Sequence, residues 1–161
     1  MSFRVAVERA LRGVPAFTRA RTEAILEIAY LTMAVDEKLQ DEEIEAFSII
    51  AAILLGKRDP SSDEPGLEGD ALRGWLDRFA IALDRASLHE RLEAAVRSLG
   101  GDQAAREASY RVACLMAMSD LDAHDREFEF DLDLIAALEL EQDVADRIAD
   151  ELNAALIDEP N

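Results

Sequence analysis

The chain has 161 residues, half of them hydrophobic, and a formal net charge of −18. A chain of this length can bury a substantial core, and its hydrophobic content excludes a disordered acidic tail. The excess of acids argues against DNA or RNA as a partner, because affinity for nucleic acids depends on Lys and Arg side chains that neutralise phosphates.

Apolar residues recur every three or four positions along nearly the whole chain, and this spacing predicts helices. Glycine and proline are scarce, at 7 and 4 residues, which also favours helix over strand. The sequence predicts eight helices, over about 2–12, 15–35, 41–55, 70–84, 88–99, 103–119, 125–140 and 142–157. We therefore expect a single all-α domain over residues 1–161, a compact bundle of seven to eight helices with a flexible loop at 56–70.

Three local signals place helix ends. Pro15 suits the first turn of the second helix, because its fixed φ is helical and its missing N–H is not needed there. Ser87 and Glu90 form a capping box that opens the fifth helix, and Gly100 ends it. Buried apolar positions are expected at Trp75 and Phe79.

The single cysteine, Cys114, excludes an internal disulfide and fits a reduced, cytoplasmic protein. Charged residues interrupt the N-terminal apolar residues, so a signal peptide is not expected. The longest apolar run, residues 47–55, is too short to span a bilayer, which predicts a protein without transmembrane segments.

Residues 1–22 hold five arginines and one acid, in contrast to the acidic remainder of the chain. Such a basic segment could dock an acidic partner or an anionic membrane surface. The alternative is that these arginines pair with the protein's own carboxylates.

Residues 29–56 align with residues 113–140 at an offset of 84, with eight of 28 positions identical. The identical pairs are Ala29/Ala113, Leu31/Leu115, Asp36/Asp120, Asp41/Asp125, Glu43/Glu127, Glu45/Glu129, Ala52/Ala136 and Leu54/Leu138. Each copy has an apolar helix, an Asp at its end, a short turn, and acids in the first turn of the next helix. This order of features predicts a duplicated helix–turn–helix, with repeat halves at about 20–56 and 103–157.

The two turns are candidates for a metal site. Asp36 and Asp120 stand at helix C-termini, where the helix dipole disfavours an acid, so a cation or a hydrogen bond should offset the cost. Glu43 and Glu127 are ordinary first-turn acids on their own. If the two hairpins pack across a pseudo-two-fold axis, the four carboxylates could converge on one ion.

Oxygen ligands favour Ca²⁺ or Mg²⁺, and the additional Asp122 and His124 could admit Zn²⁺. An EF-hand is excluded, because Asp125 stands where the loop needs glycine. The alternative is a pair of capped, solvated turns, in which Lys38 satisfies some of the carboxylates itself.

The stretches "AVDEKLQDEEIEAF" and "SDLDAHDREFEF" resemble the TerB-like domain of bacterial tellurite-resistance proteins. The same domain type occurs at the N-terminus of a membrane-anchored J-domain co-chaperone, and the resemblance covers about residues 20–155. It implies a bundle of about seven helices that binds metal through Asp36, Glu43, Asp120 and Glu127. It also implies protein partners in a stress-response complex at the inner face of the inner membrane, and no enzymatic activity.

The sequence is compatible with three alternative functions. The first is a non-catalytic TerB-like module that binds a divalent metal, protein partners, or both. The second is a metal-free protein-interaction domain, which could be a homodimer, with one of Phe128 and Phe130 in the core and the other at a contact surface. The third is a metal-dependent hydrolase using Asp120 and His124, which the absence of a phosphate-binding loop or a nucleophile motif disfavours.

Overall fold

A computed structural model describes residues 3–35, 41–56, 69–118 and 125–157, with side chains at all of these except 3, 69–71, 125–129, 156 and 157. The described residues form eight α-helices and no strand, so the prediction of an all-α bundle is confirmed. The helices are α1 (Phe3–Leu11), α2 (Arg19–Ala34), α3 (Asp41–Gly56), α4 (Gly69–Arg85), α5 (Leu88–Leu99), α6 (Gln103–Met118), α7 (Asp125–Ala137) and α8 (Gln142–Ile157). Within these residues, none of the helices combines the length and the apolar character needed to cross a membrane.

The start of α2 differs from the prediction. Pro15 does not open the helix; it lies in the connection before it, and α2 begins at Arg19. Thr18 is the N-cap, with an extended backbone (φ −60°, ψ 160°), and its hydroxyl accepts a hydrogen bond from the Arg21 N–H at 3.3 Å. A threonine cap satisfies one of the four free N–H groups of the first turn, which proline cannot do, and this explains the later start.

The ends of α5 agree with the capping signals. The Ser87 hydroxyl oxygen accepts from the Glu90 N–H at 3.1 Å, and Ser87 donates to the Glu90 carboxylate at 3.2 Å. At the other end, Gly100 adopts φ 64° and ψ −148°, a conformation open almost only to glycine, and so ends the helix. The loop predicted at 56–70 lies almost entirely outside the described residues.

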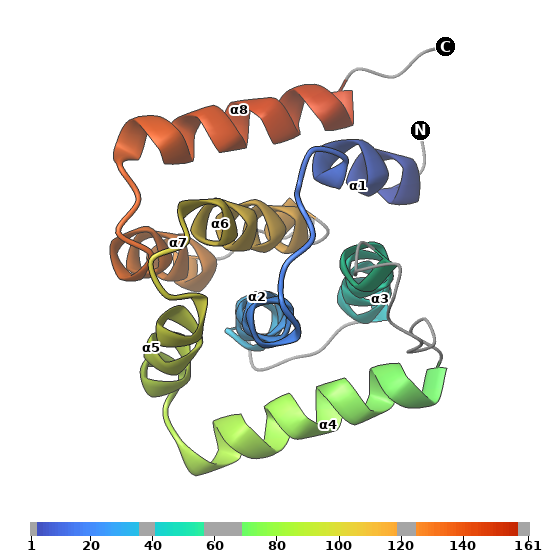
Figure 1. The fold of residues 1–161 in the computed structure, drawn as a ribbon, viewed down its shortest axis with the longest axis vertical. Helices are drawn as coiled ribbons and strands as arrows, with labels where there is room; N and C mark the ends of the chain where they lie inside the picture. Colours follow the sequence, from blue (N-terminus) through green and yellow to red (C-terminus); the bar gives the residue numbers. More distant parts are fainter. Residues whose placement is uncertain (1–2, 36–40, 57–68, 119–124, 158–161) are drawn as a thin grey trace.

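The helices form a central group crossed by two outer helices (Figure 1). Viewed down the shortest axis of the molecule, α2, α3, α6 and α7 are seen nearly end-on, while α4 and α8 cross them on opposite sides. The most extensive packing is that of α2 against α6 and against α5, followed by α6 against α8. The buried apolar residues of these helices form one core that extends over both halves of the chain.

The duplication seen in the sequence extends to the fold. Helices α2 and α6 each contain 16 residues and begin at 19 and 103, an offset of 84, and α3 and α7 begin at 41 and 125 with the same offset. A half-turn about the viewing direction of Figure 1 brings α1–α4 approximately onto α5–α8. The chain is therefore two related halves of four helices, arranged around a pseudo-two-fold axis with α2 and α6 in contact at its centre.

The predicted core residues Trp75 and Phe79 are buried, at 9% and 4% exposure. Phe79 lies at the centre of an aromatic cluster, with its ring centroid 5.7 Å from those of Tyr30 and Trp75 and 6.5 Å from that of Phe47. Such tilted and edge-on pairs add to the free energy gained from burying the rings. The cluster fixes α4 against α2 and α3.

Candidate functional sites

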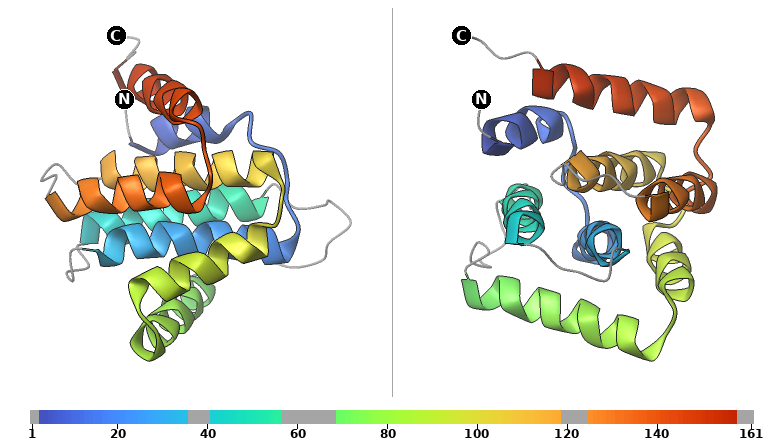
Figure 2. Two further views of the ribbon diagram at one scale, coloured as in Figure 1. Left: turned by 90° about the vertical axis from the view of Figure 1, so that its left-hand side faces the viewer. Right: turned by 180° about the vertical axis from the view of Figure 1, so that it is seen from behind.

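The two halves place their acidic turns at the same end of the molecule. The helices that precede the turns, α2 and α6, run in the same direction side by side, and both end on the left of the left-hand view in Figure 2. The helices that follow, α3 and α7, both begin on that side. Residues 34 and 41 of one half and residues 118 and 125 of the other therefore border one end of the bundle.

Most of the predicted ligands lie outside what the structure describes. Asp36, Asp120, Asp122 and His124 are outside the described residues, and Glu127 belongs to α7 but its side chain is not described. Among the described side chains, no group of three or more His, Cys, Asp or Glu residues is arranged to hold a metal.

Glu43 is the predicted ligand whose side chain the structure places. Four acids stand at or near the start of α3, and three of them (Asp41, Glu42 and Glu45) are exposed, whereas Glu43 is only 3% exposed. Its Oε2 oxygen is buried and finds no hydrogen-bond donor among the described residues, although Glu43 does take part in other interactions. Burying a carboxylate costs free energy that nearby positive charge must offset, and the N-terminus of α3 supplies some of it.

A buried ion pair that no sequence motif predicts joins α2 to α5. Glu27 is 6% exposed, and its two carboxylate oxygens accept hydrogen bonds from Nε and an Nη of Arg91 at 2.7 and 2.8 Å. The hydrogen bond to Glu27 raises the pKa of Arg91 further above its usual value. The signal was a single charged residue within the apolar run "AILEIAYL", but the sequence could not show a partner 64 residues away.

A small polar group lies between α6 and α7. Burial raises the pKa of the Cys114 thiol to about 12, although a hydrogen bond with Tyr110 opposes this. Burial also raises the pKa of Asp131, although a hydrogen bond with Tyr110 partly opposes this effect. Cys114 is therefore a protonated thiol at neutral pH, and it does not supply the thiolate that a nucleophilic cysteine needs.

The N-terminal basic segment interacts with the rest of the protein. Arg21 forms an ion pair with Asp102 at 3.2 Å, which links the start of α2 to the turn before α6. Arg9, Arg12 and Arg19 also take part in noncovalent interactions. The Arg21–Asp102 pair is a contact of the kind that the alternative interpretation of this segment predicts, between an arginine and one of the chain's own carboxylates.

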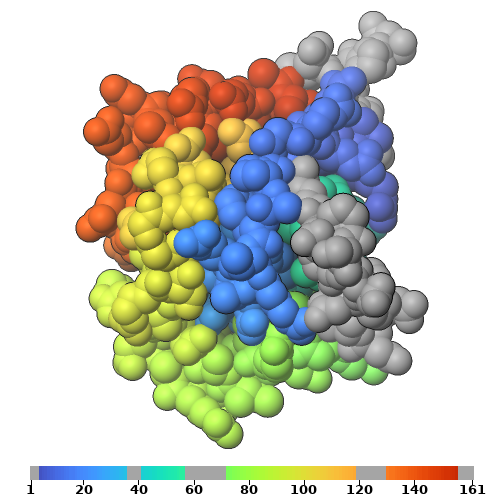
Figure 3. Space-filling view, in the orientation of Figure 1, coloured from blue at the N-terminus to red at the C-terminus, as the bar shows by residue number. Residues whose placement is uncertain are grey.

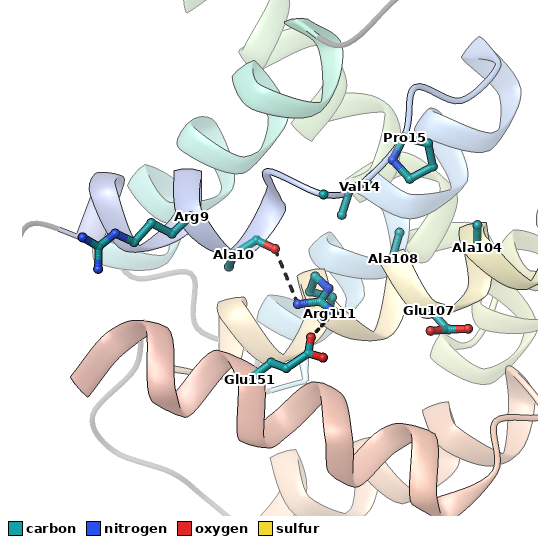
Figure 4. Close-up of a pocket in the computed structure, with 10 residues that line it drawn as sticks. Arg9, Ala10, Val14, Pro15, Ala104, Glu107, Ala108, Arg111 and Glu151 are labelled. Atoms are coloured by element: carbon teal, nitrogen blue, oxygen red, sulfur yellow. Dashed lines mark hydrogen bonds and ion pairs between the residues drawn. The ribbon is translucent and has the colours of Figure 1, made fainter. Parts of the chain in front are cut away.

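A cavity of about 460 Å³ lies where α1, α6 and α8 meet (Figure 4). Arg111 of α6 lies inside it, with its side chain 17% exposed, and donates to the Glu151 carboxylate of α8 at 2.7 Å and, weakly, to the Ala10 carbonyl oxygen at 3.5 Å. Glu107 lies one turn earlier on α6 and pairs at 2.6 Å with Arg147 of α8. No motif in the sequence marks these residues, although Arg111, like Glu27, interrupts an apolar run.

A second cavity, of about 580 Å³, lies between α5 and α7. Its polar lining includes His89 and Glu93, which pair at 2.9 Å, together with Arg97 and Asp133. The His89 and Glu93 side chains are 69% and 52% exposed, so their contact adds little to stability.

Comparison of the chain with protein-family models, with curated proteins and with solved structures finds no match.

Proposed function

We propose that the protein is a non-catalytic, TerB-like helical module that binds a divalent cation at the end of the bundle bordered by its two acidic turns. The supporting observation is geometric. One end of the molecule holds the ends of α2 and α6 and the starts of α3 and α7. A pseudo-two-fold arrangement must place these helix ends together if the four predicted ligands, Asp36, Glu43, Asp120 and Glu127, are to meet.

The burial of Glu43 supports the same proposal. This acid, and not its exposed neighbours in α3, matches the ligand position expected from the resemblance, and it is 3% exposed. A cation at this end would interact favourably with a buried carboxylate and with the acids at the C-termini of α2 and α6. Carboxylate oxygens favour Ca²⁺ or Mg²⁺, and the further donors Asp122 and His124 extend the choice to Zn²⁺.

The resemblance also supports a role in a stress-response complex of the tellurite-resistance kind. In that role the protein would be cytoplasmic, at the periphery of the inner membrane, and would contact protein partners. These parts of the proposal rest on the two acidic motifs alone.

A metal-free interaction domain is the second candidate, and the electrostatics of α3 favour it. Three acids, Asp41, Glu42 and Glu43, stand in the first turn of this helix, where the positive end of its dipole stabilises them without any ion. In this case the acidic turns are folding signals, and function resides in protein-contact surfaces.

Thermal melts of chelator-treated protein with Mg²⁺, Ca²⁺, Mn²⁺ or Zn²⁺, at matched ionic strength, separate the two candidates. Cation binding predicts a saturable rise in Tm for one ion, of about 5–10 °C at a hundredfold excess over Kd. The double variant Asp36→Asn/Asp120→Asn should abolish that rise.

The control variant Asp77→Asn/Asp84→Asn removes the same charge from exposed positions of α4 and should keep the rise. A small rise that is shared by all four ions and survives in both variants would reflect only the screening of a highly charged protein, and would reject the cation site. In the presence of each ion, a metal-free domain predicts an unchanged or higher Tm for Asp36→Asn/Asp120→Asn than for the parent protein, because the substitution relieves repulsion at the helix ends.

A further inference from the structure

The cavity between α1, α6 and α8 exists because the two halves of the molecule pack differently. In one half, residues 100–102 connect α5 to α6, and α5 packs closely against α2. In the other half, the longer segment 12–18 connects α1 to α2, and α1 packs on α3 and α8 instead of lying on α6. The N-terminal part of α6 therefore lacks a covering helix of the kind that α5 provides for α2, the helix equivalent to α6 in the other half of the molecule.

The connection between α1 and α2 forms one wall of the space that remains. In the space-filling view this connection crosses the exposed face of the molecule between α1 and the start of α2 (Figure 3). Gly13, Val14 and Pro15 of the connection line the cavity opposite Ala104 and Ala108 of α6 (Figure 4). These side chains are small and carry no polar groups, so they can accommodate a short aliphatic group.

The charged groups of the cavity balance one another. Arg111 and two glutamates (Glu107 and Glu151) face it, and Arg147 of α8 pairs with both glutamates, at 2.6 and 3.7 Å, although the protein as a whole carries a net charge of −18. Arg9 also lines the cavity, but its guanidinium group points away from these side chains (Figure 4). Of these, Arg111 is the most enclosed, with its side chain 17% exposed, and among the described contacts it uses one N–H of each terminal nitrogen. An arginine has five N–H donors, so Arg111 can bind a ligand carboxylate while it keeps Glu151.

We propose that this cavity binds a free aliphatic α-amino acid, with its carboxylate on Arg111, its ammonium group on Glu107 or Glu151, and its side chain against Val14, Pro15 and Ala108. A zwitterion matches this lining of balanced ion pairs, because its carboxylate can accept from the remaining N–H donors of Arg111 and its ammonium group can donate to the remaining lone pairs of the glutamates. The volume of about 460 Å³ lies in the range of small-molecule sites. The proposal does not depend on the proposed cation site.

Isothermal titration of the full chain tests this with three probes of the same shape: L-leucine, 3-methylbutylamine, which lacks its carboxylate, and 4-methylpentanoate, which lacks its ammonium group. Leucine should bind at one site per chain, and each analogue should bind at least about tenfold more weakly, because a charge-assisted hydrogen bond is lost. Equal binding of either analogue would overturn the proposal, since the site would then recognise a single charge. No heat from leucine, valine, isoleucine or alanine up to about 10 mM would also overturn it.

Two matched variants locate the binding site. Ala104 is exposed at the start of α6 and lines the cavity, so Ala104→Leu should fill part of the space and weaken leucine binding at least about tenfold without unfolding the protein. Ala80→Leu makes the same change on exposed α4, away from the cavity, and should leave binding unchanged. Binding that is unaffected by Ala104→Leu, or is lost equally in both variants, would show that leucine does not occupy this cavity.

Discussion

Glu27 and Arg111 stand at equivalent positions of the two halves, 84 residues apart, and carry opposite charges. Each is largely buried and each is paired with a side chain of another helix, Glu27 with Arg91 and Arg111 with Glu151. A buried charge is tolerated only when it is paired in this way, so these contacts fix how α5 and α8 lie against the centre of the bundle.

Asp131 is an acid that the fold disfavours in its charged form. Burial raises its pKa above the ordinary value of 3.8, so the folded protein binds this proton more tightly than the unfolded chain does. The ionised carboxylate therefore destabilises the folded protein at neutral pH. The contribution of Asp131 to the free energy of unfolding becomes more favourable as the pH falls through its folded-state pKa. Asp131→Asn should raise Tm at pH 7, and its advantage over the parent protein should shrink as the pH approaches about 4.

The control for this prediction is Asp133→Asn. Asp133 lies on the same helix and carries the same charge but is exposed, so its replacement changes the net charge equally without relieving desolvation. Melting curves of the three proteins between pH 4 and pH 8 provide the measurement. An equal gain for both variants would assign the effect to overall charge and not to the burial of Asp131.

Helix ends were the feature best predicted from sequence, because most of them depend on local chemistry. Ser87, Glu90 and Gly100 placed both ends of α5 correctly, and acids in the first turn marked the start of α3. The start of α2 was predicted wrongly because two local signals, Pro15 and Thr18, competed, and the capping hydroxyl determined the outcome. The partners of Glu27 and Arg111 could not be predicted, since they come from helices far away in the chain.

A substitution at Gly100 tests how much the backbone conformation at the C-terminal end of α5 contributes to stability. Its φ of 64° and ψ of −148° are strained for any residue with a Cβ, so Gly100→Ala should reduce the free energy of unfolding by about 1–3 kcal/mol. A clash is not the reason, because the nearest atom to the added Cβ, an Nη of Arg21, would be 4.0 Å away. Urea denaturation gives the measurement.

The neighbouring Gly101 is the matched control. It has no positive φ, and an added Cβ would meet no atom within 4 Å, so Gly101→Ala should change stability little or slightly increase it. Similar losses for the two substitutions would mean that the end of α5 does not depend on the unusual backbone of Gly100.

At the scale of the whole molecule, the two halves share one core. The most extensive packing is between α2 of the first half and α5 and α6 of the second, so neither half has its central helix covered without the other. We therefore expect the halves to unfold in one cooperative transition.

The chain contains a probe in each half. The fluorescence of Trp75, its single tryptophan, reports the first half, and the reactivity of Cys114, its single cysteine, reports the second, because the raised pKa of about 12 keeps the folded thiol slow to react. Urea midpoints from the two probes should coincide with each other and with far-UV circular dichroism. Two separated midpoints would show that the halves are independent units.

The arrangement that brings the acidic turns to one end of the molecule could be predicted only in part. The repeat at an offset of 84 indicated two equivalent hairpins, but it gave no sign that Glu43 is buried while its acidic neighbours are exposed. That α2 and α6 lie side by side and run in the same direction depends on packing between distant segments, which no local pattern in the sequence specifies. The cavity at Arg111 was not foreseen for the same reason, since it results from a difference between the two halves.

The contact of α2 with its own repeat, α6, has the geometry of an isologous dimer interface in which the two subunits have become one chain. In a true homodimer every substitution appears twice, so two equivalent positions always carry the same residue. Joining the halves removes that restriction and allows each surface to change on its own. Opposite charges at residues 27 and 111 are a feature that a symmetric pair of identical subunits could not have.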